Sequence, residues 1–203
     1  MFYLHQHQVK TRKIDPKLLY LQYTEGERNF SRRNLALASL CDRDFTDIKL
    51  WQANLTEVNF SRTVLHRANL EEANLKGATL WRTDLLKASL VQAECSQALL
   101  IRANLSYANL YKAKFNAAEM RLTYMVGSDL QGANLSGANL SYADLRGANL
   151  VGANLSRAIL TGANLTQANL SHANLEEAVL EGENLKKANL ECTKLTDFKK
   201  LLA

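Results

Sequence analysis

The sequence predicts an all-β solenoid, in which short extended segments and corners coil around one continuous apolar interior. A large apolar residue occupies every fifth position from Phe30 to Leu195, which makes 34 consecutive repeats, 27 of them centred on Leu. Two residues before the centre 23 repeats carry Ala, and the residue in between is Asn or Asp in 21 repeats. The 203-residue chain has one proline and no break in composition, which indicates a single domain.

A five-residue period excludes both a long helix and a long strand. In a helix, five residues advance by about 500°, so successive centres form no apolar stripe. In a strand, an odd period places alternate centres on opposite faces. Each repeat therefore contains a corner: the small residue and the centre point inward, the Asn or Asp points outward, and the last two residues form the turn. Coils stacked at about 4.8 Å bury the Leu rows, each side chain contributing roughly 1.5–3 kcal/mol.

These repeats resemble the A(D/N)LXX signature of the pentapeptide-repeat family, most clearly from Asp129 to Leu175 and more broadly from Leu50 to Leu195. The resemblance implies a right-handed quadrilateral β-helix with four repeats, or 20 residues, in each coil, and hence about 8.5 coils. The period alone leaves four walls and three walls open. The resemblance also implies a non-catalytic regulatory or adaptor role, as in cyanobacterial cell-differentiation control.

Both ends of the chain are expected to cap the solenoid, because open apolar ends aggregate. The alternative interpretation of these ends is a partner-binding arm. Asp15-Pro16 predicts the start of a helix that continues from Lys17 to Thr24 and ends at Gly26. This helix and the Gly-Glu-Arg-Asn-Phe that follows resemble the N-terminal cap of cyanobacterial members. We therefore divide the chain into an N-terminal tail and helical cap at 1–29, a repeat β-helix at 30–196, and a short C-terminal cap at 197–203.

Two groups of repeats depart from the pattern. The small inward residue is replaced in five repeats, which predicts loose or distorted first coils; these residues are Arg28, Arg33, Arg43, Ile48 and Glu183. From Val91 to Ser128 the outward Asn or Asp is repeatedly lost, and this is the least regular stretch; the replacements are Glu94, Leu99, Lys114, Glu119 and Tyr124.

The sequence indicates no enzyme, no cofactor and no metal site, because no nucleophile, base and donor groups converge. His5 and His7 lie in the N-terminal tail, and His66 and His172 fall on different walls. The three cysteines come without a secretion signal, which favours reduced thiols and a cytoplasmic location. No apolar run approaches the roughly 18 residues of a membrane span. We expect a monomer rather than a dimer, without membrane contact.

If residues 20 apart stack vertically, two adjacent walls over residues 62–126 combine six cations with large apolar groups, against only Asp84 and Glu119. Exposed Trp, Tyr and Arg together are typical of an interface hot spot. The alternative interpretation is an ordinary solvated surface. The predicted partner-binding residues are Arg62, Arg67, Trp81, Arg82, Leu86, Lys87, Ile101, Arg102, Tyr107, Arg121 and Tyr124.

The leading hypothesis is a scaffold that binds an unidentified protein through these walls. A second hypothesis, implied by some members of the family, is DNA mimicry that protects DNA gyrase; it requires a strongly negative surface, whereas this chain carries +5. A third is binding of nucleic acid or another polyanion through the Arg column. The apolar residues inside the patch favour a protein partner over nucleic acid.

Overall fold

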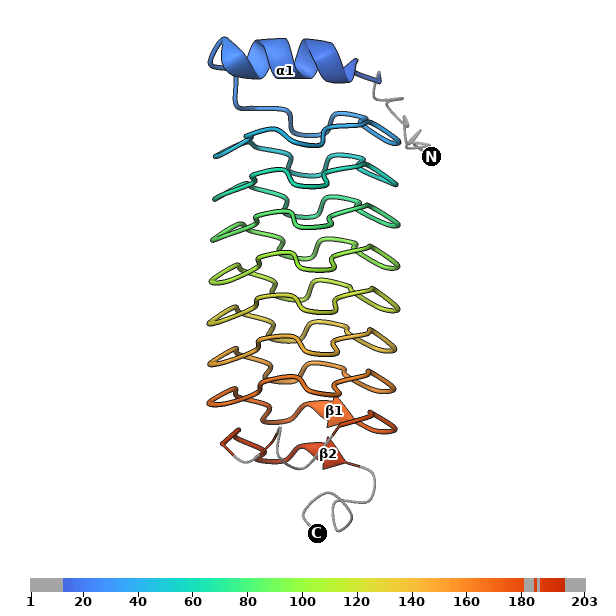
Figure 1. Ribbon diagram of the computed structural model, residues 1–203, viewed down its shortest axis with the longest axis vertical. Helices are drawn as coiled ribbons and strands as arrows, with labels where there is room; N and C mark the ends of the chain where they lie inside the picture. The colour runs from blue at the N-terminus through green and yellow to red at the C-terminus, as the bar shows by residue number, and fades with distance from the viewer. Residues whose placement is uncertain (1–12, 181–184, 186, 196–203) are drawn as a thin grey trace, which may run out of the picture.

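The computed structural model describes residues 13–180, 185 and 187–195. His5, His7, Glu183 and the predicted C-terminal cap at 197–203 lie outside these residues. Figure 1 shows a rod of stacked coils, with helix α1 (Pro16–Thr24) across one end. Strands β1 (Asn174–Leu175) and β2 (Lys194–Leu195) lie at the other end and pair in parallel.

Pairing between coils follows a constant spacing of 20 residues. In the described repeats, Asn54 pairs with Asn74, Asn74 with Glu94, and so on in parallel along the rod. The prediction of four repeats in each coil is therefore confirmed. The total number of coils stays a prediction, because part of the last coils lies outside the described residues.

Regular strands are short even though the pairing is extensive. In the described part of the chain, β1 and β2 have two residues each, and elsewhere every wall pairs through a single residue. The reason is the turn in every repeat, which leaves too few extended residues for a longer ladder.

The main chain of each repeat bonds both to the neighbouring coils and across its own turn. Leu55 N–H donates to Asn74 O on the next coil at 2.7 Å, and Asn59 N–H donates to Ala38 O on the previous coil at 2.9 Å. Val58 N–H donates to Leu55 O at 3.1 Å and closes the turn. Bonds along the rod axis therefore hold the coils in register.

The core is one column of apolar side chains along the whole axis. Every repeat centre from Phe30 to Leu175 is buried, and Leu85, Leu105 and Leu145 are completely inaccessible. The inward Ala side chains of these coils are buried with them, so the interior is filled by alternating large and small groups.

Helix α1 begins and ends where the sequence predicts. The Asp15 carboxylate accepts the Lys17 N–H at 2.7 Å as the N-cap, Pro16 is the first helical residue, and Gly26 has a φ of 104° beyond the last turn. Leu19, within α1, is fully buried.

Two tyrosines fix α1 to the first coil. The rings of Tyr20 and Tyr23 lie edge-on to Phe45, with centroids 5.9 and 5.1 Å away. The Tyr23 hydroxyl donates to Thr46 O at 2.8 Å. The helix is thus joined to the repeats by apolar packing and a directed hydrogen bond.

The expected distortion of the first coils is limited to the Arg43 repeat, whose turn lacks the closing bond from Arg43 N–H to Leu40 O that the neighbouring described repeats have. Arg28 and Arg43 turn out of the interior and stack on Tyr23 and Tyr20 of α1, each guanidinium 4.0 Å from the ring centroid. Ile48 is buried within the core, and the 20-residue pairing is already present at Asn29. The arginines are accommodated because the first coil has α1, rather than another coil, on its outer side.

Candidate protein-binding surface

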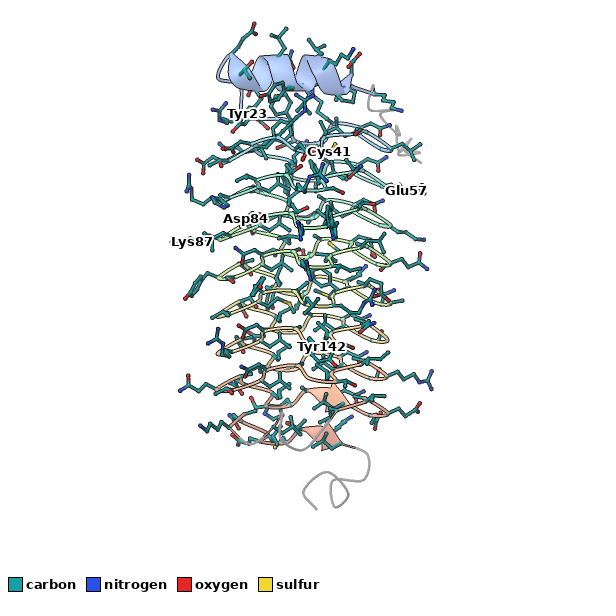
Figure 2. All side chains as sticks on the ribbon, viewed as in Figure 1. Tyr23, Cys41, Glu57, Asp84, Lys87 and Tyr142 are labelled. Carbon is teal, nitrogen blue, oxygen red and sulfur yellow. The ribbon has the colours of Figure 1, made fainter. Side chains whose placement is uncertain are left out.

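The four walls present their outward residues in vertical columns, and two adjacent walls differ from the rest. We call them wall A, centred on Phe60, Leu80, Leu100 and Met120, and wall B, centred on Leu65, Leu85, Leu105 and Met125. They meet at the A/B corner, formed by the turn residues 81–82, 101–102, 121–122 and 141–142. Figure 2 shows Lys87, at the far edge of wall B, projecting from the opposite side of the rod to Glu57.

Large apolar side chains are exposed on these two walls and at their corners. Leu99 on wall A is 42% exposed and Tyr124 on wall B 53%, while Leu122 and Tyr142 at the A/B corner are 41% and 63% exposed. Tyr107, at the far edge of wall B, is 60% exposed. Such a group is larger than the scattered single apolar residues of an ordinary surface.

The outward Asn or Asp of a repeat has a specific structural task. Its side-chain oxygen accepts the N–H two residues later, which the turn otherwise leaves unbonded, as in Asn54 Oδ1 with Thr56 N–H at 3.2 Å and Asn59 Oδ1 with Ser61 N–H at 3.0 Å. This local bond explains why the repeat favours Asn or Asp at that position.

The repeats of Leu99 and Tyr124 lack this side-chain bond to the turn N–H. Among the described residues, no oxygen accepts the N–H of Ile101 or Val126, which are the donors that an Asn at these positions would satisfy. At both positions the chain exposes an apolar side chain and loses a turn bond worth about 1 kcal/mol. Stability of the fold therefore does not explain these two residues.

The cations of the predicted patch divide into two groups. Arg62 bonds Asp42 with its Nε at 2.5 Å, and Arg67 bonds Asp47 with its Nη2 at 2.7 Å, each carboxylate one coil earlier. These guanidiniums hold the pKa values of Asp42 and Asp47 below the ordinary value. Both aspartates lie outside the 62–126 span, so two of the six cations counted there are paired with a carboxylate.

Three cations of the patch have no carboxylate partner within the described residues: Arg82, Lys87 and Arg102. Arg121 pairs with Glu119 at 3.1 Å. These three unpaired cations lie on the same two walls as the exposed apolar group.

The remaining predicted residues are less accessible. Trp81 is half-buried, with the Arg82 and Arg62 guanidiniums 4.8 and 5.6 Å from its ring centroid. Leu86 and Ile101 are also half-buried. The structure therefore brings the eleven predicted residues onto two adjoining walls but centres the exposed apolar surface nearer Leu122 and Tyr124.

Sequence reasoning omitted Leu99, Leu122 and Tyr142 from the predicted site residues. Leu99 could have been found because it replaces a turn-bonding Asn. Leu122 and Tyr142 continue the column of Arg82 and Arg102 at intervals of 20 residues.

Side chains that can ligate metals are dispersed over the described part of the rod. No three His, Cys, Asp or Glu side chains in this part of the chain lie together as metal ligands. Asp84 Oδ2 lies 2.8 Å from His66 Nε2, but the pair lacks hydrogen-bond alignment. Nor does any described helix have the length and apolar character needed to cross a membrane.

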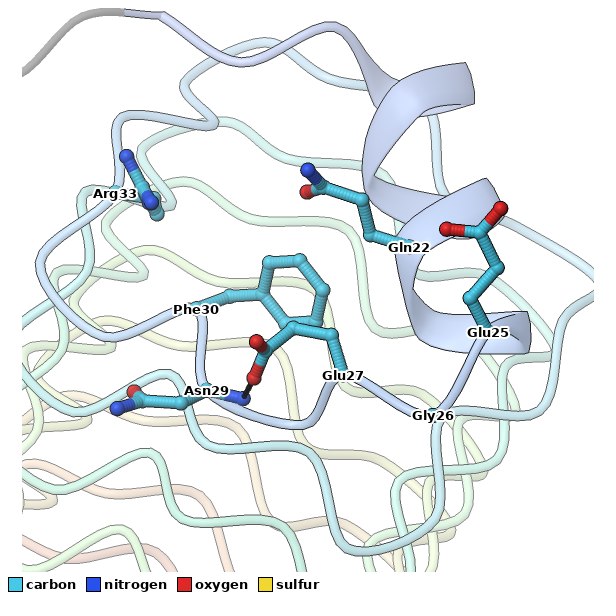
Figure 3. Close-up of a pocket in the computed structure, with 7 residues that line it drawn as sticks. All are labelled: Gln22, Glu25, Gly26, Glu27, Asn29, Phe30 and Arg33. Carbon is cyan, nitrogen blue, oxygen red and sulfur yellow. Dashed lines mark hydrogen bonds between the residues drawn. The ribbon is translucent and has the colours of Figure 1, made fainter.

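An open polar hollow lies where α1 joins the first repeat, lined by residues that include Gln22, Glu25 and Arg33 (Figure 3). The Glu27 carboxylate accepts the N–H groups of Arg28 and Asn29 at 2.8 and 2.6 Å. These bonds lower the pKa of Glu27, that from Asn29 most strongly. The hollow is explained by this junction and offers no nucleophile.

Comparison with known proteins supports the repeat architecture. Pentapeptide repeats match in eight copies over residues 44–82, 82–116, 128–167 and 163–199. No curated protein sequence gave a significant match.

Several solved structures are similar to this chain. A trypsin-treated variant of QnrB1, described as a plasmid-mediated fluoroquinolone resistance protein, is 16% identical with a TM-score of 0.57, over 86% of this chain and 88% of that one. HetL from the cyanobacterium Nostoc sp. strain PCC 7120, described as involved in heterocyst differentiation regulation, is 28% identical with a TM-score of 0.38, over 89% and 94% of the two chains. Rfr23 from the cyanobacterium Cyanothece 51142 is 23% identical with a TM-score of 0.21, over 85% and 98%.

The QnrB1 likeness extends over most of both chains and concerns the fold alone. It agrees with the four-repeat coils seen here and with a right-handed quadrilateral β-helix. Because the repeat matches cover more than half of the sequence, the chain belongs to the pentapeptide-repeat family.

Proposed function

We propose that this protein is a non-catalytic scaffold or adaptor that binds another protein through walls A and B. The observation that carries the proposal is the replacement of turn-bonding Asn by the exposed Leu99 and Tyr124. These two side chains do not stabilise the fold, but they can stabilise a complex by burying apolar surface against a partner. The predicted contacts are those of the sequence patch, in which Arg82, Arg102, Tyr107 and Tyr124 are exposed.

The surface charge supports this proposal over DNA mimicry. Walls A and B present unpaired cations, and the whole chain carries +5, which is opposite to the field of a duplex. The aliphatic side chains of Leu99 and Leu122 support a protein contact over binding to a polyanion alone.

The test restores the repeat pattern at the surface. In Leu99→Asn/Tyr124→Asn, each new Asn can bond the free turn N–H, so we expect the free energy of unfolding to rise by about 1 kcal/mol at each site. The same variant should lose the partner, measured by affinity capture from cells that express the protein, followed by mass spectrometry.

Ser89→Asn is the matched control, because Ser89 has the same place in its repeat on another wall. It should capture the same proteins as the wild type. A double variant that keeps the full set of captured proteins would contradict the proposal, and its unchanged or raised stability would exclude misfolding as the cause of any loss.

A further inference from the structure

Building on the proposed function, we propose that the partner contributes a protein segment with a pair of carboxylates next to an apolar cluster. The segment lies along the A/B corner with its carboxylates toward α1. The surface that selects it is the corner column, which we define as Arg82, Arg102, Leu122 and Tyr142. This column changes from cationic to apolar along the rod, and a complementary segment changes from acidic to apolar in the same direction.

The main chain fixes the order and spacing of the corner column. All four residues occupy the same place in their turns, with φ between 54° and 60°. Arg82 N–H donates to Ile101 O at 3.1 Å, and Leu122 N–H donates to Ser141 O at 3.0 Å, so the side chains start from successive coils. At about 4.8 Å per coil, Arg102 and Tyr142 lie about 10 Å apart along the axis. An extended segment covers this distance in about three residues.

The acidic groups close to the corner column are already engaged. Asp84 accepts from Asn104 Nδ2 at 2.9 Å and lies beside His66. Glu119 pairs with Arg121, and Asp144 pairs with Arg146 at 2.7 Å. On the α1 side, Arg62 is neutralised by Asp42. The positive charge of Arg82 and Arg102, with Lys87 nearby, is therefore left for an external carboxylate.

Arg82 and Arg102 carry like charges at the same corner of the rod. They start from neighbouring coils, and like charges at this separation repel each other. A partner with two carboxylates removes this repulsion and gains charge-assisted hydrogen bonds.

The apolar half of the column favours a polypeptide over a nucleic acid. The Tyr142 ring lies against Gly162 one coil further along, and the Tyr107 ring lies against Gly127 in the same way. Part of each ring is thus covered, and Leu122 on the corner column offers no aromatic surface on which a base stacks. These groups suit aliphatic or aromatic side chains of a protein.

The test uses a random dodecapeptide library displayed on phage, selected on the wild-type protein. Enriched peptides are synthesised with a fluorescent label, and their binding is measured by fluorescence anisotropy. We expect adjacent Asp or Glu residues followed within a few positions by large apolar residues. Binding to Arg82→Gln/Arg102→Gln should be about tenfold weaker.

Three variants make the assignment specific. Arg82→Lys/Arg102→Lys keeps the charge and should retain most of the binding, while Leu122→Ser/Tyr124→Asn should abolish it. Lys112→Gln is the matched control, because Lys112 has the same turn position on the diagonally opposite corner and no carboxylate partner among the described residues. It should bind like the wild type. Thermal unfolding of each variant verifies that it is folded.

The outcomes separate this inference from the proposed function. Peptides without acidic residues whose binding still depends on Leu122 and Tyr124 would overturn the acidic partner but keep the protein-binding surface. Peptide binding that is unchanged in Leu122→Ser/Tyr124→Asn would overturn both the acidic partner and the protein-binding surface. An absence of binding peptides would do the same. Displacement of the peptides by a single-stranded oligonucleotide that binds more tightly, and loses affinity in the Arg→Gln variant, would assign the surface to a polyanion instead.

Discussion

The second turn residue of each repeat has a positive φ, which restricts the side chains that fit there without backbone strain. Gly fills this position in repeats such as those of Gly147 and Gly162, but charged and aromatic residues fill it in most others. A non-Gly residue there costs roughly 1–2 kcal/mol of backbone strain. The bond from its N–H to the next coil, such as Arg82 N–H to Ile101 O, helps to hold it in place.

Replacing Gly162 with Ala should destabilise the protein more than replacing Gly147 with Ala. Both have a positive φ (67° and 64°), so both substitutions introduce strain of about 1 kcal/mol. At Gly162 the new Cβ would also lie 2.5 Å from ring atoms of Tyr142, whereas at Gly147 it would meet nothing within 4 Å. Urea unfolding measures the difference, and equal losses would show that Tyr142 does not rest on Gly162.

At the scale of the element, α1 depends on the coil beneath it. Of its three leucines only Leu19 is buried, and Leu18 and Leu21 face solvent. Its position comes from the edge-on packing of Tyr20 and Tyr23 on Phe45 and from the stacked Arg28 and Arg43. The helix boundaries follow from local sequence, but the two arginine contacts depend on residues brought together by the first coil.

The Glu27 junction should make stability depend on pH in acid. Because the folded state lowers the pKa of Glu27 below its ordinary value of 4.5, its contribution is complete above that value. The contribution is lost as the pH falls through the lowered pKa. The thermal midpoint of the wild type should therefore fall more between about pH 5 and 3 than that of Glu27→Gln.

Glu25→Gln serves as the control for this measurement, because the Glu25 side chain accepts no hydrogen bond from the described residues. Its acid dependence should match the wild type. If Glu27→Gln also followed the wild-type curve, the junction bonds would contribute nothing to the stability.

The whole molecule is stabilised coil by coil, and each buried centre contacts the centres above and below it. Leu105→Ala should therefore lower the free energy of unfolding by about 2–5 kcal/mol, because it opens a cavity in the middle of the rod. Leu99→Ala, on the surface of wall A, should change it by less than about 0.5 kcal/mol. Urea unfolding distinguishes the two, and a small loss for Leu105→Ala would contradict a continuous core.

The sequence by itself determined the inward positions, because a five-residue period permits no other face for the row of Leu. It also determined the limits of α1, because Asp15, Pro16 and Gly26 act through local backbone bonds. Only the tertiary structure decided which surface charges remain unpaired, since Arg62 meets Asp42 across one coil and 20 residues of sequence. The tertiary structure also decided that the side chains of Arg28 and Arg43 point away from the core, because they stack on the tyrosines of α1. The reason is physical: a short-range pattern fixes which way a side chain leaves the main chain, whereas its partner is fixed by the stacking of coils.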